Sequence, residues 1–194
     1  GLDRVDIENM LDKKDVRDKE SVHFGFAFNV PGGTMRIETP WAVVRPEVDQ
    51  LPGSCKNYLS VGRWVDVSGE ASGVSWATVD APLLEVGAIT VDVPSPLGTD
   101  GWIRRLEPTQ TFYSYVMNNY WETNYKASQD GPTVFRYAIR PHGKFDAAAA
   151  ARFGTERSRP MLVVPVEEKT PEVGSLLSIE PAEVIVTSLA PSAD

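Results

Sequence analysis

The sequence predicts an antiparallel β-sandwich, a fold in which two sheets pack face to face around one apolar core. Short segments with apolar residues at every second position recur along the chain, and turn-forming residues separate them, with 15 Gly and 15 Pro among 194 residues. Only one segment has a helix-forming composition. Many short strands with little helix are typical of a sandwich. We therefore expect residues 1–194 to form a single domain, a length sufficient for a sizeable core.

The N-terminal half is expected to supply most of the strands. Apolar residues occupy every second position from Val22 to Val30, which predicts a strand with one buried face, and the turn Pro31-Gly32-Gly33 follows it. Before this strand, we expect a short strand around Val5 and Ile7 and then an exposed, highly charged loop. Further strands are expected, in chain order, at residues 35–38, 41–44, 58–67, 73–78 and 83–93.

The C-terminal half is expected to hold two strands, one helix and two closing strands. The strands are predicted at 111–117 and 134–140. Five consecutive alanines, Ala147–Ala151, predict a helix over 144–153, and Gly154 is a plausible stop for it. Closing strands are predicted at 161–166 and 184–189. Of the tryptophans, Trp64 and Trp76 are expected to pack between the sheets, and Trp102 to be exposed or at an interface.

The charge and composition exclude several classes of partner. The formal net charge is −8 and no basic stripe is present, so an acidic surface would repel nucleic acid and anionic membranes. No apolar run reaches the roughly 20 residues that a membrane-spanning helix needs. Cys55 is the single cysteine, so the chain has no internal disulfide.

We find no residue pattern that predicts catalysis. The two histidines, His23 and His142, are far apart in sequence, and we expect no metal in this chain. Asp49 and Glu122 are the most suggestive carboxylates, but no spacing singles out the pair that glycosidic cleavage requires. Ser54 lacks the Gly-x-Ser-x-Gly elbow of a nucleophilic serine.

Recognition of a neutral polyol is better supported, by the segment 114–125. It holds three asparagines, a tryptophan and three tyrosines. Amides hydrogen-bond hydroxyl groups and flat rings cover the apolar face of a sugar, whereas in an ordinary loop the same asparagines would cap turns. The candidate carbohydrate-binding or interdomain residues are Asn118, Asn119, Trp121, Thr123, Asn124 and Gln129. Arg45 and Arg63 are candidates for holding loops through carboxylates.

A series of short motifs runs through most of the chain, in a fixed order. They are Pro40-Trp41, Arg45-Pro46-Glu47, Asp49-Gln50-Leu51-Pro52-Gly53-Ser54-Cys55-Lys56-Asn57, Arg63-Trp64-Val65-Asp66-Val67-Ser68, Trp76-Ala77-Thr78, Asp80-Ala81-Pro82-Leu83, Asn118-Asn119-Tyr120-Trp121 and Gly131-Pro132. In this order they resemble the C-terminal β-domain of glycoside hydrolase family 38, the zinc-dependent α-mannosidases. The resemblance extends from about residue 13 to residue 142. One departure is Gly62, where a larger polar residue is expected.

The resemblance implies a large two-sheet supersandwich of the galactose-mutarotase-like kind, of which this chain is a fragment. It also implies that the zinc ion and an aspartate nucleophile belong to a separate N-terminal catalytic domain, which hydrolyses α-mannosides with retention. This segment would then be inactive alone, would brace that domain, and would bring the loop around Trp121 near its sugar site. Its partners would be the catalytic domain and mannose-containing glycans.

Two other functions stay open at this point. The chain could be an autonomous carbohydrate-binding module, with the segment around Trp121 as its own sugar site. It could also be a purely structural element that forms homo-oligomers through open strand edges.

Overall fold

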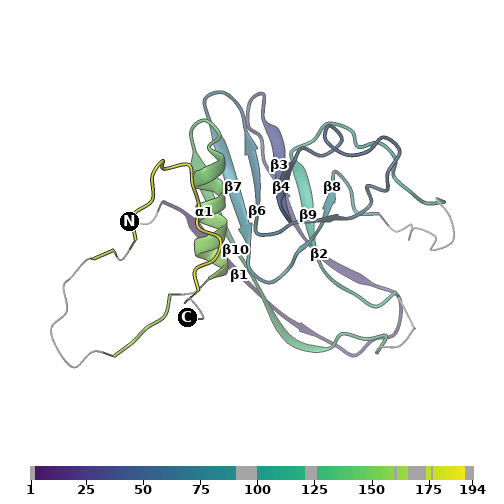
Figure 1. Ribbon diagram of the computed structural model, residues 1–194. Helices are drawn as coiled ribbons and strands as arrows, with labels where there is room; N and C mark the ends of the chain where they lie inside the picture. Colours follow the sequence, from purple (N-terminus) through teal and green to yellow (C-terminus); the bar gives the residue numbers. More distant parts are fainter. Residues whose placement is uncertain are drawn as a thin grey trace.

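The computed structural model describes residues 3–90, 100–120, 126–159, 161–165, 174–175 and 177–190. Two antiparallel sheets pack face to face, and one helix covers the outer face of the larger sheet (Figure 1). This architecture confirms the predicted β-sandwich.

The larger sheet has six strands in the order β1-β10-β7-β6-β3-β4, and the smaller has four in the order β2-β9-β8-β5. The strands are β1 (Val5–Lys13), β2 (Ser21–Ala27), β3 (Thr34–Thr39), β4 (Ala42–Val44), β5 (Leu59–Ser60), β6 (Trp64–Ser68), β7 (Gly73–Thr78), β8 (Leu83–Val86), β9 (Thr111–Asn118) and β10 (Gly131–His142). The helix α1 spans Ala147–Ser158. Every strand pair is antiparallel.

The core between the sheets is built around Trp76 of β7. Its ring centroid lies 5.2 Å from that of Phe26, 5.1 Å from that of Phe112 and 5.2 Å from that of Tyr137. The Tyr137 hydroxyl donates a hydrogen bond to Ser114 Oγ at 2.9 Å, and burial raises the pKa of Tyr137 to about 12. The period of two in β2 therefore points its aromatic side chains into this core, as the sequence predicted.

The expected strand at 58–67 is divided between the two sheets. β5 belongs to the smaller sheet and β6 to the larger one, so the chain crosses from one sheet to the other at residues 61–63. At this crossing the Gly62 amide donates to the carbonyl of Glu38 at 2.7 Å. A continuous strand was predicted because both halves keep the same alternation of apolar residues.

The outer face of the larger sheet packs against α1 and forms a second, smaller core. Ala77, Ala138 and Phe153 make this cluster, and Trp64 lies on the same face, beside Gly154 and Phe145. The prediction that Trp64 packs between the sheets is therefore wrong. Alternation along β6 points Val65 into the sandwich core, so its neighbour Trp64 faces the helix.

The helix differs from its predicted limits. It begins after Asp146, whose carboxylate accepts hydrogen bonds from the amides of Ala148 and Ala149, and it continues to Ser158. Gly154 is not a stop but lies inside the helix, where a β-carbon would come within 2.7 Å of Trp64 Cδ1. This glycine allows α1 to approach β6 closely.

The two predicted closing strands are also wrong over their described residues. Neither 161–165 nor 184–190 is assigned to a strand, and Met161, Leu162, Val163 and Val164 are exposed. Because α1 already covers the outer face of the larger sheet, these apolar residues are left outside both cores.

We expect the substitution Gly154→Ala to destabilise the protein by about 1–3 kcal/mol, because the added methyl group collides with a buried tryptophan. In an open helix the same change would stabilise by up to about 1 kcal/mol, so the sign of the effect is diagnostic. Urea unfolding measures it. Gly143→Ala is the matched control, because a β-carbon there would meet its nearest neighbour at 4.0 Å. Equal stability of the two variants would contradict this explanation.

Candidate functional site

The predicted recognition segment follows the end of β9. Trp121, Thr123 and Asn124 lie outside the described residues, whereas Asn118, Asn119 and Gln129 lie within them. The backbone amide of Asn118 donates to Gln129 Oε1 at 2.7 Å, so the structure brings these two residues together. Gln129 itself is exposed. This contact joins the chain on either side of the segment 121–125.

Asn119 is buried and anchors a neighbouring loop. Its Nδ2 group donates to the carbonyl oxygens of Val16 and Asp18 at 2.9 and 2.8 Å, and its Oδ1 accepts from the Glu20 amide at 2.7 Å. Both amide protons are therefore engaged by the backbone. The side chain holds the charged segment 16–20 against the end of β9.

The motif residues from 45 to 57 form a loop closed by their own polar side chains. Arg45 forms a two-pronged ion pair with Asp49, with Nη2 2.8 Å from Oδ1 and Nε 2.9 Å from Oδ2, as predicted for Arg45. The Asp49 carboxylate also accepts from the Arg45 backbone amide at 2.8 Å. Asp49 is thus engaged in holding the loop.

The same loop is fastened to residues 101–106 by two buried polar side chains. Lys56 Nζ lies 3.0 Å from Glu47 Oε2 and donates to the Arg104 carbonyl at 2.6 Å. Asn57 accepts from the Ile103 amide at 2.8 Å and donates to the Gly101 carbonyl at 3.0 Å. These contacts fix the loop near its start and at its end.

Two apolar residues of this loop face outward. Val48 is 64% exposed and Leu51 is 78% exposed, while Lys56 and Asn57 are buried. In a solvated loop the opposite arrangement is favourable, because polar side chains face water. The buried polar side chains therefore fix a loop that presents two apolar side chains at the surface.

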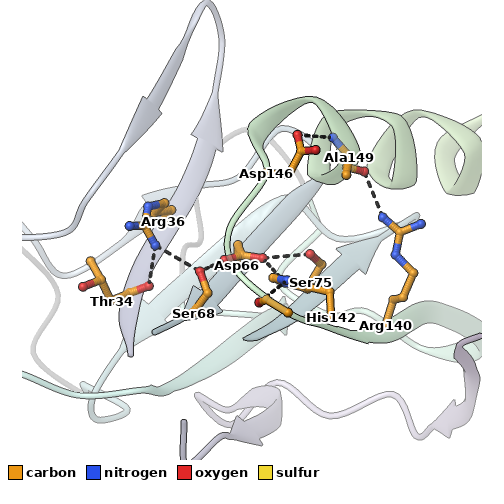
Figure 2. Close-up of polar contacts among 10 residues, drawn as sticks. Thr34, Arg36, Asp66, Ser68, Ser75, Arg140, His142, Asp146 and Ala149 are labelled. Carbon is orange, nitrogen blue, oxygen red and sulfur yellow. Dashed lines mark hydrogen bonds and ion pairs between the residues drawn. The ribbon is translucent and has the colours of Figure 1, made fainter. Parts of the chain in front are cut away.

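A buried polar cluster lies on the face of the larger sheet near the start of α1 (Figure 2). Asp66 is fully buried and accepts hydrogen bonds from Ser68 Oγ at 2.5 Å and Ser75 Oγ at 2.8 Å. His142 Nε2 lies 2.7 Å from the same carboxylate. His142 is the last residue of β10.

This cluster contains serine, histidine and aspartate but not in the order of a catalytic triad. The carboxylate is the hub, and both serine hydroxyls donate to it, so neither hydroxyl hydrogen-bonds the imidazole that would remove its proton. Arg36 continues the network by donating to Ser68 Oγ at 3.1 Å (Figure 2). Its guanidinium lies over the Phe145 ring. The cluster therefore joins β3, β6, β7 and β10 below α1.

His23 lies on the outer face of the smaller sheet, in contact with a glutamate. Its Nε2 is 2.5 Å from Glu85 Oε2, and its ring stacks on Tyr115 with centroids 4.4 Å apart. Tyr58 also stacks on Tyr115, with centroids 5.5 Å apart, and burial raises the pKa of both tyrosines. Among the described residues, no group of three or more His, Cys, Asp or Glu could hold a metal ion.

A cavity of about 670 Å³ lies between the β3–β4 hairpin and α1. Its walls include Glu38, Trp41, Arg63, Trp64 and Thr155. Sequence reasoning missed this site because its residues are distributed over four segments of the chain. The one available signal was the Pro40-Trp41 pair, where two predicted strands meet.

No protein-family model matches the sequence, and no curated protein does. In the part of the chain that the structure describes, no helix is long and apolar enough to cross a membrane.

We expect Asn119→Ala to lower the free energy of unfolding by about 2–3 kcal/mol, because it leaves two carbonyls and one amide without their partner. Trypsin cleavage within residues 14–20 should accelerate. Asn118→Ala is the adjacent control and should change stability by less than about 0.5 kcal/mol. If the two variants behave alike, Asn119 does not anchor this loop.

The Arg45–Asp49 pair also predicts a pH dependence. The Arg45 side chain and amide hold the pKa of Asp49 to about 2, below the ordinary aspartate value of about 4. The ion pair therefore stabilises the loop fully at pH values above the ordinary aspartate pKa of about 4. This stabilisation is lost as the pH falls through about 2. A carbon NMR titration of the carboxyl group should show this midpoint, and Arg45→Gln should raise it. Asp80, paired independently with Arg136, should not change in that variant.

Proposed function

We propose that this chain is a non-catalytic β-sandwich segment of a family 38 glycoside hydrolase and braces the catalytic domain of an α-mannosidase. The ordered motifs resemble that family, and the sandwich is the fold that the resemblance implies. The zinc ion and nucleophile of such an enzyme would belong to the catalytic domain.

The observation that carries this proposal is the loop of residues 45–57. Its polar motif residues hold the backbone through Arg45–Asp49, Lys56–Glu47 and Asn57, while Val48 and Leu51 are presented to the outside. A preorganised loop loses little conformational entropy on association, and its apolar side chains gain by burial. Such a loop fits a permanent contact with a neighbouring domain.

The segment after β9 has a second part in this proposal. Asn119 fixes the start of this segment, and the Asn118–Gln129 contact joins the described residues on its two sides. We assign Asn118, Trp121, Thr123, Asn124 and Gln129 to the edge of the sugar site or to the domain contact. Asn119 positions this segment.

The alternatives make different predictions for the isolated chain. An autonomous carbohydrate-binding module would bind mannose-type glycans through Trp121 and its neighbours. An oligomerisation element would associate through the open edges, which belong to β1 and β4 in the larger sheet. The loop of residues 45–57 supports a protein contact and not the binding module, because its exposed apolar residues lie outside the segment around Trp121.

The test compares the chain with a longer polypeptide that joins it to its N-terminal catalytic domain. With an aryl α-mannoside and zinc, we expect turnover by the longer polypeptide and none by the chain alone. Val48→Ser with Leu51→Ser should lower the activity and the unfolding temperature of the longer polypeptide. In the isolated chain both residues are exposed, so the change in stability should stay within about 0.5 kcal/mol.

The matched control is Met10→Ser, an exposed apolar residue on β1, outside the loop. It should leave the activity of the longer polypeptide unchanged. Zinc-dependent turnover by the chain alone would overturn the proposal, and so would a longer polypeptide without α-mannosidase activity.

A further inference from the structure

The cavity between the β3–β4 hairpin and α1 has the size and the lining of a small-molecule site. Its volume is about 670 Å³, within the range that ligand pockets have. Apolar side chains make much of the wall, and a few polar groups converge on it. The lining residues used below are Glu38, Trp41, Arg63, Trp64 and Thr155.

Trp41 is held at the rim in an unusual backbone conformation. It follows Pro40 in the two-residue turn between Thr39 and Ala42, and its φ is 65°. Non-glycine residues adopt this left-handed region rarely, and a bulky side chain there is strained by about 1 kcal/mol or more. Trp41 is 100% exposed. Burial of its indole against the described residues therefore does not offset this strain. A strained backbone that displays an aromatic ring indicates a contact surface.

The polar part of the wall is an incomplete ion pair. Arg63 Nη1 lies 3.9 Å from Glu38 Oε1, beyond hydrogen-bond distance, and instead donates to Thr155 Oγ1 at 2.9 Å. Glu38 Oε2 is buried and has no hydrogen-bond partner. Burial raises the pKa of Glu38, although Arg63 and the backbone amides of Arg63 and Trp64 act in the opposite direction.

Two further features belong to the same wall. Gly62 leaves the space that the carboxylate occupies, since a β-carbon there would lie 3.1 Å from Glu38 Oε2. This is the position at which a larger polar residue was expected. The Trp64 indole Nε1 is also buried without a partner, although indole N–H groups are usually satisfied when buried.

These groups select a neutral ligand rich in hydroxyl groups. The charges of Glu38 and Arg63 balance, so neither an anion nor a cation gains a net attraction from the pair. A hydroxyl group can accept from the guanidinium and donate to the carboxylate at the same time. The exposed indole face of Trp41 can cover the C–H face of a sugar ring.

We propose that this cavity binds a neutral pyranose ring, stacked on Trp41 with its hydroxyl groups on Glu38 and Arg63. An apolar peptide would cover Trp41 but would leave Glu38 Oε1 and Arg63 Nη1, which lie 3.9 Å apart, without a group that bridges them. The site is separate from the Asn118–Gln129 segment, because it lies on the outer face of the larger sheet and β9 belongs to the smaller one. It does not depend on the proposed function.

The test is an NMR titration of the five indole N–H signals of the labelled chain. The probes are methyl α-D-mannopyranoside, methyl α-D-glucopyranoside and methyl β-D-galactopyranoside at tens of millimolar. We expect the Trp41 and Trp64 signals to shift saturably with at least one of them. The signal of Trp102, which does not line the cavity, should stay in place.

Two variants test the assigned contacts. Trp41→Ala should weaken binding at least about tenfold through loss of the stacked ring, and Glu38→Gln by about tenfold, because hydrogen bonds to a charged group are the stronger ones. Leu51→Ala is the matched control, an exposed apolar residue that does not line the cavity, and should bind the sugar normally. Leu51 belongs to the proposed domain contact and not to the cavity. Loss of that contact and loss of sugar binding can therefore be observed independently of each other.

Three outcomes would overturn the proposal. The first is no saturable shift with any of the three sugars. The second is sugar binding that Trp41→Ala leaves unchanged. The third is saturation by choline or by inorganic phosphate without saturation by a sugar, which would make the cavity a cation or an anion site.

Discussion

The burial of strands β6 and β7 on both faces is the constraint on which the rest of this structure depends. Every residue of the two strands is buried, from Trp64 to Ser68 and from Gly73 to Thr78. One face packs against the smaller sheet through Trp76, and the other lies against α1 and the residues before it. A strand enclosed on both sides has no solvent to accommodate a misplaced side chain.

This enclosure explains the polar cluster and the glycines around it. Asp66 cannot reach water, so its carboxylate must be satisfied from the neighbouring strands, and Ser75, Ser68 and His142 do this. Gly73 leaves room for the His142 ring above the sheet. Gly154 does the same for Trp64, so that the helix can cover the strand without a gap. The cluster therefore stabilises the layered arrangement.

The candidate sites all lie at the borders of this enclosed centre. The loop of residues 45–57 leaves the edge strand β4, the segment around Asn119 leaves β9, and the Trp41 cavity opens where α1 meets the β3–β4 hairpin. At such borders the backbone is no longer dictated by strand pairing, so side chains can be held for contacts outside the chain. The rigid centre supplies the fixed positions from which these groups are presented.

The sequence by itself determined the sandwich, most of its strands and the presence of one helix. Local alternation and alanine propensity carry that information, and β2 and β9 follow it closely. Only the tertiary structure decided which face each strand presents and which segments pair. The examples are the position of Trp64, the division of the expected strand at 58–67, and the segments 161–165 and 184–190, which form no strand. It also decided that Asp66 and His142 meet across 76 positions of sequence and that Glu38, Arg63 and Trp41 share one cavity. The physical reason is that strand pairing and helix docking join distant residues, and a local pattern does not record which partner a face will find.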